Sequence, residues 1–173
     1  GTQPGAANSV YQAELWNPTT QQWRTAATAQ RIRTYHSVSM LLPSGSVLTS
    51  GGGLPGPENN LNSEIYYPPH LFKRTNGIVG WVNRPQINTI SGSATYGGAL
   101  NLGMSDNRQI ASASLTSLGK VTHSYNTDQR QIPLTINQSG AALQATLPTS
   151  TATLPPGSYL LQAIDSTGVP TPS

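Results

Sequence analysis

Two imidazoles and a phenol are the side chains of this sequence whose types could do chemistry together. Tyr35 and His36 are adjacent, and His123 lies far downstream. Imidazole nitrogen and phenol oxygen suit a tetragonal Cu(II) ion, so a protein could offer this set to a redox-active copper. The alternative is structural: Tyr35 packs between strands, His36 bonds a carbonyl group, and His123 is solvated in a loop. Residue types alone leave both interpretations open.

The place of the Tyr35-His36 pair in the chain limits how it can act. Adjacent residues on a regular strand point to opposite faces of the sheet. For both side chains to reach one metal ion, the backbone must be irregular there or stand at the entry of a strand. The pair directly precedes the strand-like segment that begins at Ser37, which fits this condition.

The composition is typical of a turn-rich, all-β protein with a polar but uncharged surface. Only 9% of the 173 residues are Asp, Glu, Lys or Arg, against about 25% in ordinary soluble domains. Nine basic residues against six acidic ones, without a basic cluster, argue against a nucleic-acid partner. No cysteine is present, so this chain supplies no thiolate or disulfide. No apolar stretch is long enough to predict a membrane span, and residues 137–139 form a glycosylation sequon, Asn-Gln-Ser.

Short strands separated by turns are expected over residues 11–72. The residue pattern of AELW at 13–16 recurs in SEIY at 63–66. A period of about 50 residues with glycines and aromatics in register is the kelch signature of a β-propeller blade. A propeller needs about four to eight blades, whereas this stretch supplies two strands of one blade and three of the next. The chain is therefore predicted to be the C-terminal portion of a longer protein.

A second all-β unit is expected over residues 85–173, after a linker at 73–84. Apolar alternation recurs there in segments of strand length separated by turns, which predicts a β-sandwich of immunoglobulin type.

Three segments resemble the galactose oxidase and glyoxal oxidase family of copper-radical oxidases. They are RTYHSVSMLLPSGSVLTSGGG at 33–53, VTHSYNTDQRQIPLTI at 121–136 and LPPGSYLLQAIDSTGVPTPS at 154–173. The resemblance implies the last one to two blades of a kelch β-propeller over residues 1–72. It also implies an immunoglobulin-like (E-set) sandwich over 85–173 that lacks its last strand. Family members often carry a Cys pair where this chain reads LPGPE at 54–58.

Carried over residue by residue, the resemblance implies one copper ion held by Tyr35, His36 and His123. Tyr35 would be the axial phenolate that takes the substrate hydroxyl proton. A long hairpin would deliver His123 from the second unit. Support of the site, without metal ligation, is implied for four further residues: Arg33, Asn126, Asp128 and Arg130. The radical cofactor of the family, a Tyr cross-linked to a Cys, would come from the missing N-terminal part.

The implied function is a secreted oxidase that converts a primary alcohol, sugar or aldehyde while reducing O2 to H2O2. This chain alone would be inactive, because it lacks the cysteine of the radical cofactor. The alternative is a non-catalytic kelch plus sandwich module for carbohydrate binding or adhesion. A third interpretation is that this chain is a structural fragment that completes another chain, and this interpretation is compatible with the oxidase.

Overall fold

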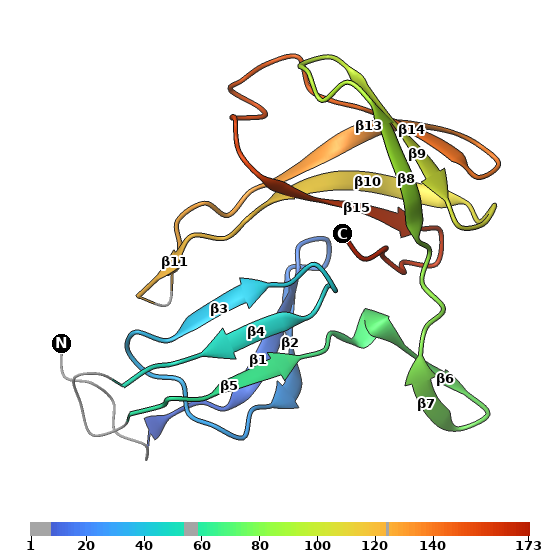
Figure 1. Ribbon diagram of the computed structural model, residues 1–173. Helices are drawn as coiled ribbons and strands as arrows, with labels where there is room; N and C mark the ends of the chain where they lie inside the picture. The colour runs from blue at the N-terminus through green and yellow to red at the C-terminus, as the bar shows by residue number, and fades with distance from the viewer. Residues whose placement is uncertain (1–7, 54–58, 124) are drawn as a thin grey trace. The chain divides into compact units, whose positions relative to one another are not determined.

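The computed structural model of the chain describes residues 8–53, 59–123 and 125–173. Its regular elements are β-strands apart from short 3-10 turns, so the all-β prediction is confirmed (Figure 1). The LPGPE segment at 54–58 lies outside the described residues. The fold divides into two compact units. The first takes in the described residues of 1–41, 47–66 and 120–127, and the second those of 42–46, 67–119 and 128–173.

The first unit contains a two-stranded and a three-stranded antiparallel sheet, the strand numbers expected from the sequence. β1 (Gln12–Asn17) pairs with β2 (Gln22–Thr28), and β3 (Val38–Leu41), β4 (Val47–Ser50) and β5 (Ser63–Tyr66) form a meander. A third pair, β11 (Val121–Thr122) and β12 (Tyr125–Asn126), also belongs to this unit. The assignment of these sheets to propeller blades stays a prediction.

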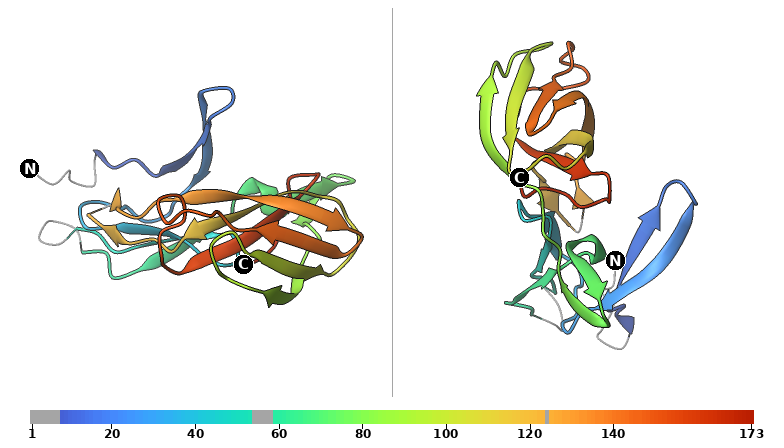
Figure 2. Two further views of the ribbon diagram at one scale, coloured as in Figure 1. Left: turned by 90° about the horizontal axis from the view of Figure 1, so that it is seen from above. Right: turned by 90° about the vertical axis from the view of Figure 1, so that its right-hand side faces the viewer.

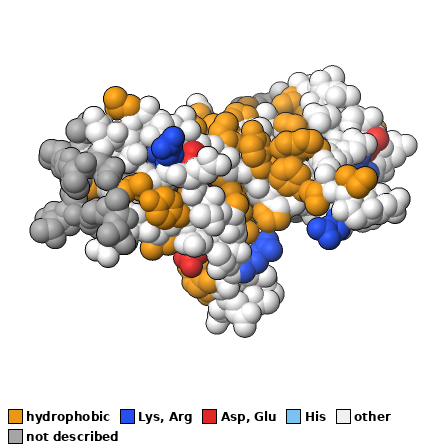
Figure 3. Space-filling model, turned by 90° about the horizontal axis from the view of Figure 1, so that it is seen from below, with side chains coloured by type: hydrophobic (Ala, Val, Ile, Leu, Met, Phe, Trp, Pro, Cys, Tyr) orange, Lys and Arg blue, Asp and Glu red, His pale blue; other side chains and the backbone are white. Residues whose placement is uncertain are grey.

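The first unit buries little apolar surface. Among the described residues, Ile32 is its one buried aliphatic side chain, at 9% exposure. Trp16 and Trp23 face each other across β1 and β2 with ring centroids 5.2 Å apart, yet they remain 46% and 64% exposed. Figure 3 shows the molecule from below, with further hydrophobic side chains (orange) exposed on that face.

The second unit is a curved six-stranded sheet wrapped around one core (Figure 2). Its strands are β8 (Ile87–Gly92), β9 (Ala99–Met104), β10 (Ile110–Ser117), β13 (Gln131–Ser139), β14 (Ala142–Thr146) and β15 (Tyr159–Asp165). Their order across the sheet is β15-β10-β13-β14-β9-β8. The first half of β13 pairs with β10 and its second half with β14. This long strand therefore joins the two halves of the sheet.

The core of the second unit follows from period-two alternation. In β13 and β14 every second side chain is buried or half-buried, as expected for strands with one face on a core. Leu143 is 1% exposed and Ala145 is fully buried, and they join buried side chains of neighbouring strands in one cluster. At the start of β15, the Tyr159 hydroxyl donates a hydrogen bond of 2.6 Å to the Pro155 carbonyl. A tyrosine bonded to backbone a few residues upstream is a feature of immunoglobulin-type sandwiches.

The range expected to be a linker contains regular structure. After the 3-10 turn η2 (Pro69–Leu71), β6 (Phe72–Thr75) and β7 (Ile78–Trp81) form a hairpin. Asn76 and Gly77 close it with φ of 51° and 82°, as a type I′ turn requires. The Asn-Gly dipeptide is the sequence signal for this hairpin, in a range that was predicted only as a linker.

Arg84 anchors the chain where it enters the sandwich. Its guanidinium donates to the carbonyl groups of Ser44 (2.6 Å), Pro170 (2.8 Å) and Thr171 (2.7 Å). Burial lowers the pKa of Arg84. The Thr171 amide also bonds the Ala163 carbonyl, so the C-terminal segment lies beside β15. The predicted domain boundaries and the predicted lack of a last strand stay predictions.

Acid is expected to destabilise the second unit through a cluster around Arg108. Hydrogen bonds from Arg108 lower the pKa of Asp106. Burial opposes the charge of Asp165, but hydrogen bonds from Thr167, Val169 and Arg108 outweigh it and lower the pKa of this carboxyl too. A carboxyl whose pKa is lowered by folding stabilises the fold at pH values above its ordinary pKa, which is near 3.8. This contribution is lost as the pH falls through the pKa of the carboxyl in the folded state.

The measurement is the urea midpoint of the second unit from pH 7 to pH 2. We expect a flat region above about pH 5 and a fall below about pH 4, near the ordinary pKa of Asp. Asp165→Asn should make the fall shallower. An acid profile that this substitution leaves unchanged would contradict the assignment.

Candidate metal centre

Tyr35 and His36 occupy a tight turn directly before β3. The Ser37 amide donates to the Thr34 carbonyl at 3.0 Å, which closes the turn around the pair. His36 has φ of 66°, in the left-handed region that residues other than glycine rarely adopt. The pair is therefore not on a regular strand, and the expected irregular backbone is present.

A glycine run after β4 supports this turn. The Gly53 amide donates to the Tyr35 carbonyl at 2.7 Å. Gly52 has φ of 108°, and a Cβ atom there would lie 3.0 Å from the Thr34 nitrogen. Both the backbone conformation and the close approach require glycine at this position.

Arg33 ties the same turn to β5. Its guanidinium donates to the carbonyl groups of Gly51 (3.2 Å) and Asn62 (3.3 Å) and to the Glu64 carboxylate (3.2 Å). Arg33 and Glu64 are only 14% and 24% exposed, so this ion pair is better shielded from water than most surface pairs. These contacts are consistent with the supporting role expected for Arg33.

His123 is presented at the end of the β11–β12 hairpin. It follows β11 directly, has φ of 51°, and its Nδ1 lies 2.8 Å from the Thr122 hydroxyl. β11 lies beside β3, the strand that follows the Tyr35-His36 turn. Because Nδ1 is engaged, Nε2 is the nitrogen that would face a metal ion. Thr122 was not among the residues expected to support the site from the sequence.

The other expected supporting residues divide between the two units. Asn126 accepts a hydrogen bond from the Lys120 amide at 3.2 Å, which closes the base of the His123 hairpin. Asp128 and Arg130 belong to the second unit, where their side chains pair at 3.4 Å. Their backbone carbonyls accept hydrogen bonds from Ser117. Asn126 thus lies within the hairpin, and Asp128 and Arg130 lie at its junction with β13.

The three ring side chains lie together. The ring centroids are 3.9 Å apart for Tyr35 and His36, 4.8 Å for His36 and His123, and 5.6 Å for Tyr35 and His123. The His36 and His123 planes meet at 67°. With metal–imidazole bonds of about 2.0–2.1 Å, each ring centroid lies roughly 3 Å from the ion. Two imidazoles whose bonds to the ion meet at a right angle therefore have centroids roughly 4–5 Å apart. The 4.8 Å spacing of the His36 and His123 rings lies in this range.

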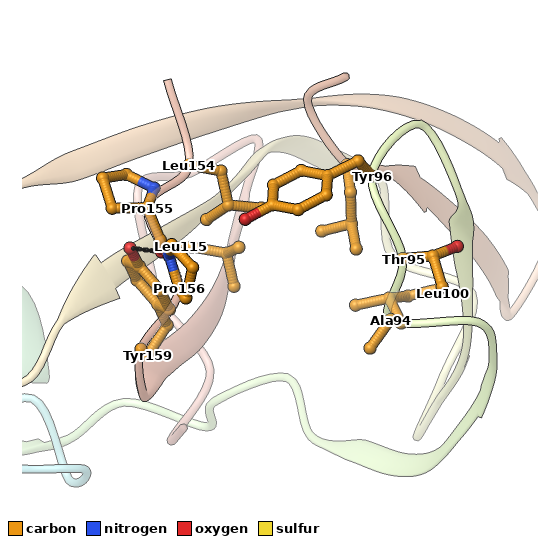
Figure 4. A pocket seen from close by; sticks show the side chains of 11 residues that line it. Ala94, Thr95, Tyr96, Leu100, Leu115, Leu154, Pro155, Pro156 and Tyr159 are labelled. Atoms are coloured by element: carbon orange, nitrogen blue, oxygen red, sulfur yellow. Dashed lines mark hydrogen bonds between the residues drawn. The ribbon is translucent and has the colours of Figure 1, made fainter. Parts of the chain in front are cut away.

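Other features of the described residues are weaker candidates for a functional site. No group of three or more His, Cys, Asp or Glu is found among them. A cavity of about 580 Å³ in the second unit is lined mainly by apolar side chains, and its Tyr159 hydroxyl is already bonded to Pro155 (Figure 4). Within the described ranges, no helix is long and apolar enough to cross a membrane.

Three known relatives or domains are similar to this chain in sequence. Residues 84–173 match the family model described as galactose oxidase-like, Early set domain. The chain is 34% identical over 165 residues to galactose oxidase from Gibberella zeae, covering 93% of the chain and 24% of that protein. It is 28% identical over 159 residues to a WSC domain-containing protein from Arthroderma benhamiae, covering 90% of the chain and 16% of that protein. The chain thus spans a quarter or less of the length of these relatives.

A solved structure has a similar fold. The fold matches that of a fungal alcohol oxidase solved in complex with copper, with a TM-score of 0.83 and 28% sequence identity. The match covers 94% of this chain and 34% of that one.

Proposed function

The chain belongs to the galactose oxidase-like family, and from this premise we propose that it is the C-terminal, copper-binding part of a copper-radical oxidase. The whole protein would oxidise a primary alcohol, sugar or aldehyde and reduce O2 to H2O2. Its first unit would complete a kelch β-propeller. Secretion is part of the proposal, and the exposed position of the sequon residue Asn137 on β13 fits a glycosylated protein.

One observation carries the proposal: the ring of His123 lies beside the rings of Tyr35 and His36, although the sequence places His123 far downstream of that pair. Both histidines have positive φ, a conformation that costs free energy and persists only where surrounding contacts fix it. The hydrogen bonds of the turn and of the hairpin provide those contacts. A non-catalytic carbohydrate-binding module would need none of the three rings to meet.

The donor set fits copper, since two imidazoles and a phenol are ligands that suit Cu(II). His36 and His123 would hold the ion through ring nitrogens and Tyr35 through its phenol oxygen. When bound, copper supplies one-electron redox chemistry. Thr122 fixes the orientation of the His123 ring, as outer-shell partners of metal-binding histidines do. Tyr35 would act as the base that accepts the hydroxyl proton of the substrate.

The second half of the redox cofactor must come from elsewhere. A cross-linked Tyr-Cys pair requires a cysteine, and this chain has none. The parts of the relatives that the chain does not span would supply that pair and most substrate contacts. The partners are therefore the N-terminal propeller portion, O2 and a small-molecule substrate.

We expect the 173-residue chain, loaded with Cu(II), to produce no H2O2 from primary alcohols or aldehydes above a copper-only control. The longer protein should produce it, and Tyr35→Phe should slow that activity by about 10²–10⁴-fold, the usual contribution of a general base. The measurement is a peroxidase-coupled assay. Turnover by the chain alone, or full activity of the Tyr35→Phe protein, would refute the proposed mechanism.

A further inference from the structure

The outer face of the second unit carries a sequence motif that the proposed copper site does not use. Residues 137–139, Asn-Gln-Ser, have the pattern that N-linked glycosylation requires, an asparagine followed two positions later by serine or threonine with no proline between them. The sequence has one further asparagine with a threonine two positions on, Asn17, but Pro18 stands between the two. This proline rules out Asn17 as an acceptor, so Asn137 is the acceptor that the sequence offers.

Strand β13 presents the two outer residues of this motif to solvent. Residues two apart on a strand point to the same face, and Asn137 and Ser139 are both exposed. Among the residues that the structure describes, neither side chain has a hydrogen-bond partner. The side-chain amide of Gln138, between them, donates to the carbonyl groups of Arg108 and Gly140, each at 2.9 Å. The middle residue of the motif therefore anchors the strand, and the two outer residues stay available for modification.

The surface beside Asn137 is polar and uncharged. Asn137 pairs across the sheet with Gln144 of β14, and Gln144 pairs with Asn101 of β9. All three side chains are exposed, and the Gln144 amide donates to the side-chain oxygen of Asn101 at 3.1 Å. These three residues and Ser139 contribute to the lining of a hollow of about 240 Å³. Protein-binding surfaces are rich in Trp, Tyr and Arg, whereas this row of amides suits the hydroxyl and N-acetyl groups of a sugar.

We propose that Asn137 carries an N-linked glycan whose first sugar residues rest on the row formed by Asn137, Gln144 and Asn101. In the attachment step, Nδ2 of Asn137 forms a bond to C1 of the first sugar of a lipid-linked oligosaccharide diphosphate. The bond from C1 to the diphosphate breaks, Nδ2 loses one proton, and the lipid diphosphate leaves. This inference rests on secretion, which is part of the proposed function, because the sugar donor and its transferase belong to the secretory pathway.

Expression of the 173-residue chain through a eukaryotic secretory pathway tests the attachment. A supplied signal peptide directs the chain, so the outcome does not depend on whether the natural protein is secreted. The wild-type chain should appear as a heavier form that peptide-N-glycosidase converts to the bare chain with aspartate at position 137. Asn137→Gln and Ser139→Ala should each abolish the heavier form, and Ser139→Thr should keep it.

A second acceptor on the β6–β7 hairpin serves as the control. Ile78→Thr gives Asn76 a threonine two positions on, and Ile78 is 74% exposed. A glycan on Asn76 of this variant shows that the chain has met the transferase. Glycosylated Asn76 together with unmodified Asn137 in the same chain would overturn the inference.

A thermodynamic cycle tests where the glycan rests. The Tm of the second unit is compared between the glycosylated chain and Ser139→Ala, and the same difference is measured in the Gln144→Ala background. A lost hydrogen bond to the sugar should make the Tm gain from the glycan smaller by roughly 2 °C or more in that background. Gln86→Ala, at an exposed amide outside the row, should leave the gain unchanged. Equal gains in the wild-type, Gln144→Ala and Gln86→Ala backgrounds would overturn the proposed position of the glycan. Copper is absent throughout, so the result does not depend on the proposed oxidase activity.

Discussion

Replacing His123 with alanine is expected to lower the affinity of the chain for Cu(II) by about 100-fold or more. Loss of an outer-shell partner alone costs about 10–100-fold in metal affinity, and a direct ligand contributes at least as much. The variant should still fold, because His123 lies at the end of a short hairpin and not in the core. His36→Ala should have an effect of the same size.

The chain offers a matched control in its third histidine. His70 lies in η2 of the second unit. Partial burial and the charge of Arg84 lower its pKa, so it is a neutral imidazole at pH 7 that is chemically able to bind copper. His70→Ala should leave the Cu(II) affinity, measured by isothermal titration, unchanged. An affinity that falls only for His70→Ala would mean that copper binds elsewhere.

Truncating Leu143 to alanine is expected to destabilise the second unit by about 2–5 kcal/mol, the usual cost of such a cavity in a core. Leu143 is 1% exposed in the central strand β14, where it pairs with Leu102 of β9. Little of the cavity can be refilled, because strands on both sides of β14 fix its position.

The free energy of opening of the β13 amides, from native-state hydrogen exchange, measures this effect for the second unit alone. Ile90→Ala on β8 is the control, since Ile90 is 59% exposed and surface substitutions change stability by about 0.5 kcal/mol or less. A similar loss of opening free energy in Leu143→Ala and Ile90→Ala would contradict the placement of Leu143 in the core.

The sequence predicted most strands because turn residues and alternation are local signals. The two-strand and three-strand sheets of the first unit and the six strands of the second unit follow them. The β6–β7 hairpin carries an equally local signal, the Asn76-Gly77 dipeptide, although this range was predicted as a linker.

Other features depend on contacts that no local pattern encodes. AELW and SEIY have the same alternation, yet β1 and β5 bury opposite faces, because burial is decided by the neighbouring strands. The approach of His123 to His36 depends on the β11–β12 hairpin and on two left-handed backbone positions. The resemblance suggested this approach, whereas spacing alone did not.

Electron paramagnetic resonance of the chain with one equivalent of Cu(II) tests the shared site most directly. Nitrogen hyperfine structure reports how many imidazole nitrogens bind the ion. A shared site predicts two nitrogens in the wild-type chain and in His70→Ala, and one in His36→Ala and in His123→Ala. A spectrum that is the same in the wild-type chain, His36→Ala and His123→Ala would show that these residues do not share a copper ion.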